Sequence, residues 1–371
     1  MLSMSYGKST QEKCQSKGEL ILKKAAFHNL GCKVNAYELE GMEESLRNAG
    51  YEIVPFTEKA DVYVINTCTV TRVADQKSRQ MISRAKTLNP DAIVVACGCY
   101  ANTGKNVLLR DGVADIILGN NEKSQLNEEI EKLKAARLTD KNAKETLVPD
   151  INKGHWEFEE TTVSMKEEHT RAFLKVEDGC NQFCTYCIIP FARGRERSRD
   201  PERVAEEVRT LVEKGFREFV LTGIRLTSYS YEGFTLTDLI EKISVIDGVH
   251  RIRLGSLEPK AVTEDFARRL SAIPNFCPHF HLSLQSGSAG VLKRMNRHYT
   301  PEEFMESVSY LRKYFKDPAL TADMICGFPG ETEEEFNESL EFARKVGFYE
   351  IHVFPYSVRQ GTKAEKMPGQ L

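Results

Sequence analysis

Short apolar runs alternate with amphipathic stretches along the first part of the chain. The apolar runs predict strands, and the stretches whose apolar residues recur with a helical period predict helices. The predicted strands cover residues 25–27, 61–65, 92–96 and 114–118, and the predicted helices cover 37–48, 73–88 and 123–136. Strands that alternate with helices favour a parallel sheet covered on both faces. We therefore expect a doubly wound α/β domain over residues 23–145.

The same alternation returns in the second half. Predicted strands cover residues 172–177, 218–221, 251–254, 279–284, 320–324 and 350–354, and helices cover 201–214, 235–246, 261–270, 301–313 and 332–345. Thr300 before Pro301, and Thr332 with Glu335 three residues later, are helix start signals. Six strands fall short of the eight in a closed TIM barrel. Residues 171–371 are therefore expected to form an open (β/α)6 partial barrel.

The remaining segments lack this periodicity. Residues 1–22 are expected to be a flexible leader, and the polar residues 146–170 a linker. The leader has no apolar core, so it is not a signal peptide, and no run reaches the roughly 18 apolar residues of a membrane span. Ten cysteines in a chain of this kind favour metal binding or catalysis over disulfides. We expect a cytoplasmic protein.

Three cysteines stand close together after the first predicted barrel strand. Cys180, Cys184 and Cys187 have the spacing C-x3-C-x2-C, which can place three thiolates on three irons of a cubane cluster. The fourth iron then stays open for a substrate. A zinc knuckle is the alternative, but a closed zinc site needs a fourth ligand, and the next histidine along the chain is His250.

The residues around this motif resemble those of a known family. Tyr186 before the last cysteine is typical of the radical S-adenosylmethionine (SAM) superfamily, and the run Cys187-Ile-Ile-Pro-Phe-Ala-Arg-Gly-Arg-Glu-Arg-Ser-Arg199 is similar to that of the methylthiotransferases. The resemblance implies that the open iron binds SAM, which is reduced and cleaved to a 5′-deoxyadenosyl radical. Candidate SAM contacts lie near the cluster motif and at strand ends: Tyr186, Thr222, Gly223, Ser256 and Gln285.

Further cysteines follow three predicted strands of the first domain, at Cys32, at Cys68 and at Cys97 or Cys99. In a parallel sheet such loops share one edge, where ligands gather. The resemblance implies an auxiliary [4Fe-4S] cluster on Cys32, Cys68 and Cys99, the last preferred because Gly98 precedes it and Ala101 follows it. The alternative is a radical SAM enzyme with one cluster, in which these cysteines belong to the core.

Four alternate arginines form a local basic patch in a chain of net charge −3: Arg193, Arg195, Arg197 and Arg199. We expect them on one face of an extended segment, where they would meet RNA phosphates. The competing interpretation is an ion-paired strand edge, because Glu196 and Asp200 stand among them.

The resemblance also implies a substrate. The run Leu-Gly-Cys-Lys-Val-Asn around Cys32 is similar to the branch that converts N6-threonylcarbamoyladenosine at position 37 of tRNA to its 2-methylthio derivative; the isopentenyladenosine branch usually has Gln-Met in place of Lys33-Val34. Expected partners are the tRNA anticodon stem-loop, an electron donor such as a flavodoxin or ferredoxin, and a sulfur donor.

Three alternatives remain open for the function. They are methylthiolation of isopentenyladenosine in tRNA, methylthiolation of a ribosomal-protein aspartate, and a zinc-stabilised RNA-binding module without catalysis. The family's carboxy-terminal TRAM domain is expected to be absent, since the sequence stops where it would begin. Weak, salt-sensitive RNA binding is then expected.

Overall fold

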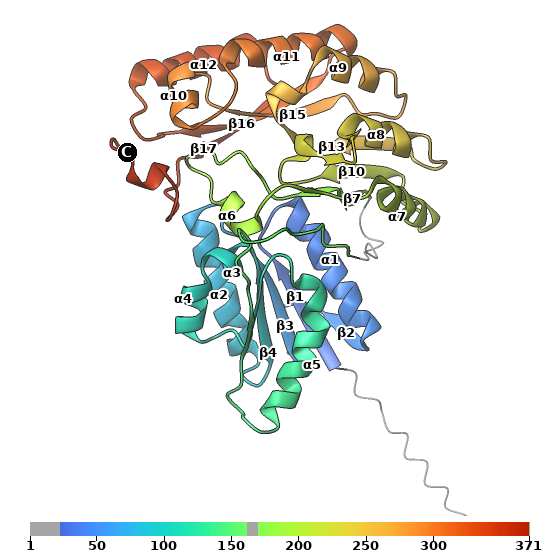
Figure 1. Cartoon of the computed structure of the whole chain (residues 1–371), viewed down its shortest axis with the longest axis vertical. Coiled ribbons are helices and arrows are strands. Elements are labelled where there is room, and N and C mark those ends of the chain that lie inside the picture. The colour runs from blue at the N-terminus through green and yellow to red at the C-terminus, as the bar shows by residue number, and fades with distance from the viewer. Residues whose placement is uncertain (1–22, 162–169, 371) are drawn as a thin grey trace, which may run out of the picture.

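The structure is a computed structural model that describes residues 23–161 and 170–370. The expected leader, residues 1–22, and part of the expected linker, residues 162–169, lie outside the described residues. Figure 1 shows two parts in the described chain, a sheet with helices on both sides below and a curved sheet with an outer row of helices above. The predicted α/β architecture is confirmed.

The first part contains a six-stranded parallel sheet in the order β2-β1-β3-β4-β5-β6. Its strands are β1 Lys23–Asn29, β2 Tyr51–Val54, β3 Val62–Thr67, β4 Ile93–Gly98, β5 Ile116–Leu118 and β6 Glu145–Leu147. The helices are α1 Lys33–Asn48, α2 Arg72–Leu88, α3 Cys99–Thr103, α4 Lys105–Asp111 and α5 Leu126–Arg137, with a 3-10 turn η1 at Lys123–Gln125. The edge strands β2 and β6 were not predicted, because runs of four and three residues are too short to show a periodic pattern.

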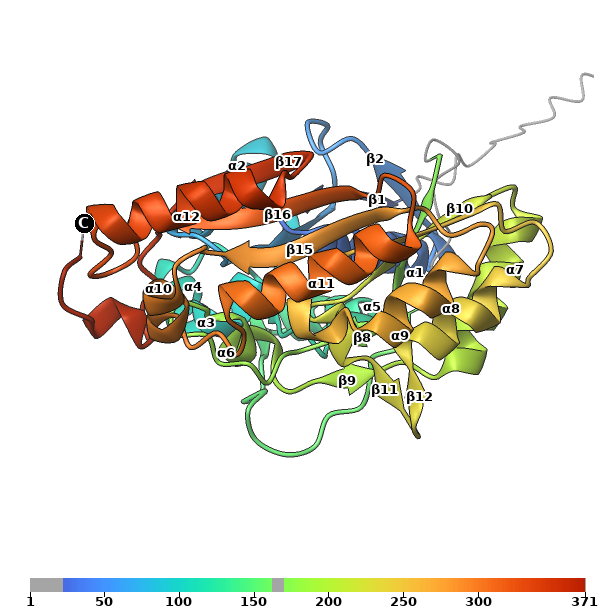
Figure 2. The same ribbon diagram turned by 90° about the horizontal axis from the view of Figure 1, so that it is seen from above.

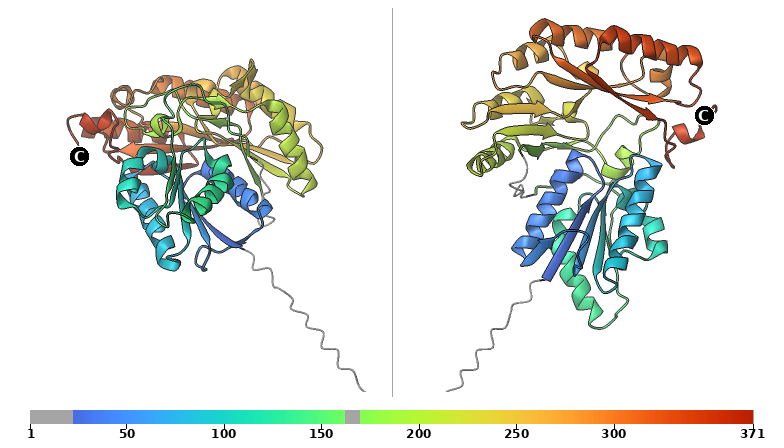
Figure 3. Two further views of the ribbon diagram at one scale, coloured as in Figure 1. Left: turned by 60° about the horizontal axis from the view of Figure 1, so that its bottom comes forward. Right: turned by 180° about the vertical axis from the view of Figure 1, so that it is seen from behind.

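Both faces of this sheet are covered, as a doubly wound fold requires (Figure 3). On one face Val64 and Val95 pack with Leu46 of α1 and Ile130 of α5. On the other face their neighbours along the strands pack against α2, α3 and α4; these residues include Tyr63, Ile65, Val94 and Ala96. Since β3 and β4 bury residues on both faces, their sequences are continuous apolar runs.

The second part is an open parallel barrel. Its strand positions are β7 Ala172–Lys175, β10 Glu218–Thr222, β13 Arg251–Leu254 continued by β14 Ser256–Leu257, β15 His279–Gln285, β16 Ala319–Cys326 and β17 Glu350–Pro355. The pairings β7-β10-β13 and β14-β15-β16-β17 are all parallel, and a bridge between Ile252 and Phe276 joins the two groups. The predicted six-stranded partial barrel is confirmed.

Helices cover one side of this barrel, as Figure 2 shows from above. They are α7 Pro201–Glu213, α8 Leu236–Ser244, α9 Glu264–Ser271, α11 Pro301–Tyr314 and α12 Glu333–Val346, with the shorter α6 Ile189–Arg193 and α10 Ala289–Arg294. The predicted start signals are present, because Thr300 and Thr332 both form capping boxes. The remaining pieces are β8 Glu177–Asp178 paired with β9 Arg197–Ser198, β11 Ser230–Tyr231 paired with β12 Phe234–Thr235, η2 Leu226–Ser228, η3 Pro259–Ala261 and η4 Ala364–Lys366.

Side chains alternate along β15. Phe280, Leu282 and Leu284 are buried in the core shared with the helices, and the residues between them are half-buried on the opposite side of the strand. In Figure 1 this opposite side of the barrel sheet faces the first part of the chain. Among the described residues, no helix combines the length and the apolar composition needed to cross a membrane.

Candidate metal centres

Cys180, Cys184 and Cys187 lie on one loop between β8 and α6. Gly179 allows the loop to turn, since its φ is +83° and a Cβ there would stand 1.9 Å from the carbonyl oxygen of Arg195. The Cys180 N–H donates to the Gly194 carbonyl (3.0 Å), and the Cys187 N–H donates to the Cys184 carbonyl (3.0 Å). The loop thus folds back, and its three thiols lie close enough to interact electrostatically.

A buried arginine touches this triad. The Arg297 Nη1 donates to the Cys184 Sγ at 3.3 Å, and its Nη2 donates to both carboxylate oxygens of Glu258 at 2.7 and 2.8 Å. The carboxylate fixes the guanidinium against the cysteine loop. Arg297 was not predicted, because a single arginine between two helices carries no spacing signal.

The second group of cysteines lies at the carboxyl ends of three neighbouring strands. Cys32 caps the start of α1 after β1, Cys68 follows β3, and Cys99 begins α3 after β4. Burial raises the pKa of Cys68 to about 11, and the Cys99 and Cys32 thiols add to this shift. The structure therefore brings the Cys32 and Cys99 thiols within electrostatic reach of the Cys68 thiol.

Close backbone packing fixes the strand ends that carry Cys32, Cys68 and Cys99. Gly98 has a φ of +91°, and a Cβ on it would stand 2.5 Å from the Asn66 Oδ1 and 2.6 Å from the Thr67 carbonyl oxygen. The Asn35 Nδ2 donates to the Thr67 carbonyl (3.1 Å), and the Asn66 Nδ2 donates to the Asn35 carbonyl (2.8 Å). Only glycine fits at position 98, and the two asparagines fix the loop after β3 to the start of α1.

Cys97, the rival of Cys99, occupies a different environment. Its side chain packs in the apolar core beneath α1 and α5, where its Sγ lies 3.8 Å from the Met42 Sδ and 3.6 Å from the Ile65 carbonyl oxygen. Burial raises the pKa of the Cys97 thiol to about 12. The geometry favours Cys99 as the third ligand, because Cys97 is enclosed in the core.

Neither triad is arranged around a single metal ion. In the part of the chain that the structure describes, no three His, Cys, Asp or Glu side chains surround one ion position. A single ion draws all its ligands to one centre, whereas a cubane takes each thiolate on a separate iron, so its cysteines lie farther apart. Burial raises the pKa of Cys180 and of Cys187 to about 12. Metal binding must therefore displace their protons.

The four predicted RNA-binding arginines are not one exposed row, which corrects that expectation. Arg193, Arg197 and Arg199 are buried, and carboxylates pair with each of them. Arg195 is exposed and lies over the ring of Phe183 at 4.6 Å. Three of these side chains hold the protein together and cannot reach phosphates without breaking buried ion pairs.

The predicted SAM contacts lie beside the cysteine loop or near the carboxyl ends of barrel strands. Thr222 ends β10, Gly223 follows it, Ser256 begins β14, Gln285 ends β15, and Tyr186 is packed edge-on against Phe328. A Cβ on Gly223 would stand 2.6 Å from the Glu177 Oε2. Burial raises the pKa of Glu177 to about 8, and within the described residues its Oε1 has no hydrogen-bond partner. This carboxylate was not predicted as a site residue.

The chain has recognisable relatives. Residues 174–343 match the radical SAM superfamily, and residues 24–119 match the uncharacterized protein family UPF0004. The chain is 42% identical to the threonylcarbamoyladenosine tRNA methylthiotransferase MtaB of Bacillus subtilis, covering 93% of this chain and 76% of that protein. It is 40% identical to the MtaB of Aquifex aeolicus, over 94% and 84% of the two chains.

A second group of relatives has another name. The chain is 35% identical to the tRNA-2-methylthio-N(6)-dimethylallyladenosine synthase of Moorella thermoacetica, over 92% of this chain and 77% of that protein. Among solved structures, the radical SAM methyltransferase TsrM of Kitasatospora setae superposes with a TM-score of 0.66 at 16% identity, over 90% of this chain and 75% of that one. That likeness shows the fold. The identities to the methylthiotransferases over nearly the whole chain show that this protein belongs to the radical SAM methylthiotransferase family.

Proposed function

We propose that this enzyme converts N6-threonylcarbamoyladenosine at position 37 of tRNA to its 2-methylthio derivative. Its relatives at 37–42% identity carry the threonylcarbamoyladenosine name, and those named for dimethylallyladenosine reach 35%. The observation that carries the proposal is the pair of cysteine triads, one at the carboxyl strand ends of each sheet, joined by the contact of α6 with Cys99. A one-cluster enzyme would not need the second triad.

The residues have separate roles in this proposal. Cys180, Cys184 and Cys187 hold the [4Fe-4S] cluster that binds SAM, and Cys32, Cys68 and Cys99 hold the auxiliary [4Fe-4S] cluster. When bound, the clusters and SAM supply the radical, sulfur and methyl chemistry that acid and base side chains cannot perform. The protein positions these groups and keeps them out of bulk water. Arg297, fixed by Glu258 beside Cys184, supplies a positive charge where SAM would lie, and Glu177 beside Gly223 supplies a buried carboxyl group that is mostly protonated near neutral pH.

The charge around Cys32 supports the threonylcarbamoyl substrate. Its threonyl group carries a carboxylate, whereas a dimethylallyl group carries no charge. Lys33 is exposed at the start of α1. Although part of the side chain is exposed, partial burial lowers the pKa of Lys33, and so do the positive charges of Arg171 and Arg253, whereas Cys32 acts in the opposite direction. Arg171 and Arg253 already pair with Glu218, at 3.9 and 2.7 Å, and a substrate carboxylate beside Lys33 would add a second negative charge to this group of cations.

The reaction requires further partners. An electron donor such as a flavodoxin or ferredoxin has to reduce the cluster, and a sulfur donor has to replace the sulfur that each turnover consumes. The tRNA anticodon loop would present its base splayed out of the stack, as single-stranded RNA commonly does. We place the enzyme in the cytoplasm, where thiols stay reduced and tRNA is available.

Nucleoside analysis tests the substrate. A strain that lacks the gene is complemented with the wild type or with Cys99→Ala, and tRNA nucleosides are measured by mass spectrometry. We expect the unmodified threonylcarbamoyladenosine to accumulate in the deletion strain and to be methylthiolated again by the wild type only. If only the dimethylallyl nucleoside changed, the substrate of the enzyme would be dimethylallyladenosine and not threonylcarbamoyladenosine. Unchanged 2-methylthio nucleosides in the deletion strain would exclude the tRNA substrate.

A further inference from the structure

A buried network of charged side chains joins the two parts of the chain. Its centre is Arg193 of α6, which is fully buried. The Arg193 Nη1 donates to the Glu38 Oε1 of α1 (2.8 Å) and to the Asp178 Oδ1 of β8 (3.0 Å), and the Nη2 donates to the Glu38 Oε2 (3.0 Å) and to the Asn35 Oδ1 (2.5 Å). Both α1 residues belong to the first part of the chain, so the guanidinium crosses the junction.

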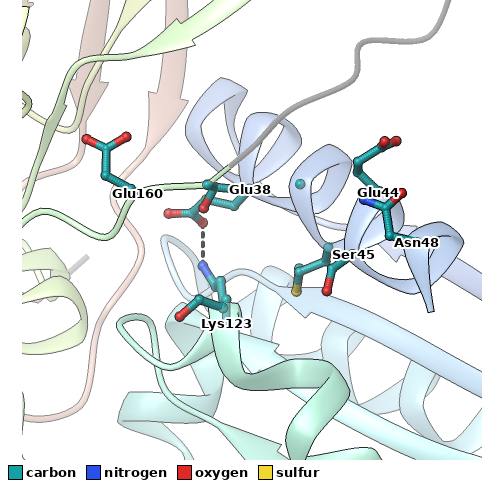
Figure 4. A pocket seen from close by; sticks show the side chains of 10 residues that line it. Glu38, Glu44, Ser45, Asn48, Lys123 and Glu160 are labelled. Atoms are coloured by element: carbon teal, nitrogen blue, oxygen red, sulfur yellow. Dashed lines mark hydrogen bonds and ion pairs between the residues drawn. The ribbon is translucent and has the colours of Figure 1, made fainter. Parts of the chain in front are cut away.

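Three further cations complete the network. The Lys175 Nζ lies 2.7 Å from Glu38 and 2.7 Å from Asp178, the Arg197 Nη2 lies 3.1 Å from Asp178, and Lys123 pairs with Glu38, as the dashed line in Figure 4 marks. The side chains are 0–5% exposed.

The positive charge in this network is not balanced. Four cationic side chains share two carboxylates, Glu38 and Asp178. Three more carboxyls face these cations: the half-buried Glu159 acts on Lys175, Glu122 acts on Lys123 and Arg197, and Glu177 acts on Arg197. Burial raises the pKa of Glu122 to about 7 and that of Glu177 to about 8, so both are only partly ionised near neutral pH and a small excess of positive charge remains. Uncompensated charge is costly in a buried site. The excess predicts that an anionic group lies next to the network.

The fifth N–H donor of Arg193 indicates what this anionic group is. The Arg193 Nε donates to the Cys99 Sγ at 3.2 Å, so every N–H direction of the guanidinium ends on a carboxylate, an amide oxygen or this sulfur. A cysteine that ligates iron is a thiolate, and a hydrogen bond from a guanidinium to a thiolate is charge-assisted. A cluster held by three thiolates would supply the negative charge that the network lacks.

We propose that Arg193 is a positioning residue that fixes Cys99 of the auxiliary cluster to the barrel and raises the reduction potential of that cluster. The inference rests on the proposed function, since it takes Cys99 as a ligand. Hydrogen bonds to cluster sulfurs and nearby charge set such potentials. One-electron reduction makes the cluster more negative by one charge, and a fixed positive charge stabilises the reduced form.

The test isolates the auxiliary cluster. In a parent variant, Cys180, Cys184 and Cys187 are replaced by alanine in the full chain, and the remaining cluster is reconstituted anaerobically. Electrons come from dithionite, which is oxidised as the cluster takes up one electron, and the midpoint potential is read from the visible absorbance and from the electron paramagnetic resonance signal. Arg193→Lys, which keeps the charge, and Arg193→Gln, which keeps a neutral donor, are made in this parent.

Arg199→Lys is the matched control. Arg199 is also buried at the junction and pairs with Glu160 and Glu207, and its Nη1 donates to the Tyr37 hydroxyl of α1 at 3.3 Å. None of the hydrogen bonds described for Arg199 ends on a sulfur. A loss of packing or of junction stability would affect this variant in the same way, without touching the cluster.

We expect Arg193→Gln to lower the equilibrium constant for reduction at least tenfold, which is about 59 mV for one electron. Arg193→Lys should lower the midpoint potential less than Arg193→Gln does, and Arg199→Lys should leave the midpoint potential unchanged. Loss of iron in the folded Arg193 variants, with iron retained in Arg199→Lys, would also support the proposal. An unchanged potential in both Arg193 variants, or an equal shift in the control, would overturn it. A parent variant without any iron would overturn the auxiliary cluster itself, and with it the proposed function.

Discussion

Glu38 offers the sharpest test of how the two parts of the protein are held together. Its carboxylate pairs with Lys123, Lys175 and Arg193, and all four side chains are at most 3% exposed. Glu38→Gln would leave the four buried cations of the network with Asp178 as the remaining carboxylate at its centre. Removing one partner of a buried ion pair costs about 3–5 kcal/mol, because the other charge is left uncompensated. We expect a loss of unfolding free energy in this range.

Glu44 of the same helix provides the control. Glu38 and Glu44 both line a cavity of about 290 Å³, and Figure 4 labels both side chains. Glu44 pairs with Arg47 at 3.3 Å, and the side chains are 21% and 37% exposed. An ion pair of this kind contributes at most about 1 kcal/mol. Glu44→Gln should therefore be nearly neutral.

Urea unfolding followed by circular dichroism measures both variants, with the slope checked for a change in cooperativity. Adding Lys123→Met to Glu38→Gln removes one of the uncompensated cations, so the double variant should lose less than the two single variants together. The reasoning would be refuted if Glu38→Gln and Glu44→Gln lost equal amounts below about 1 kcal/mol, or if the losses in the double variant simply added.

Three further predictions concern the sites. Replacing either cysteine triad by alanine should halve an iron content of about eight per chain, as expected of two cubanes, whereas Cys97→Ala should leave iron unchanged; a loss of iron in Cys97→Ala would reverse the choice of Cys99. Arg297→Met should weaken SAM binding at least tenfold by isothermal titration while the iron content stays intact, and an unchanged affinity would separate Arg297 from the SAM site. Because burial raises the pKa of Glu177 from 4.5 to about 8, the folded protein keeps a proton there that the unfolded chain loses, so stability falls as the pH rises from about 5 to 8. Between pH 6 and pH 8 we expect the wild type to lose about 1–3 kcal/mol of unfolding free energy through this group, and Glu177→Gln should not show this loss. Equal pH slopes of the unfolding free energy in the two proteins would contradict the assignment.

Most of the local structure follows from the pattern of residues along the chain. The pattern of apolar residues predicted the inner strands and the long helices. Strands β3 and β4 are buried on both faces and form continuous apolar runs, whereas each barrel helix is buried on one face and shows a helical period. The spacing of Cys180, Cys184 and Cys187 predicted a cluster loop, since ligands close in sequence need only a local turn. The three strand ends that carry Cys32, Cys68 and Cys99 followed from the rule that parallel strands end at one edge.

The polar side chains that become buried at the junction could not be predicted, because their burial depends on how the two parts of the chain pack together. Arg193, Arg197 and Arg199 were predicted to face RNA, yet they pair with Glu38, Asp178 and Glu160, which lie elsewhere in the chain. Cys97 and Cys99 differ by two positions, and their separate environments depend on how β4 ends against α1 and α6. Periodicity along a sequence reports which face of an element is apolar. It does not report which charges meet when two domains dock, because those partners are set by the packing of distant segments.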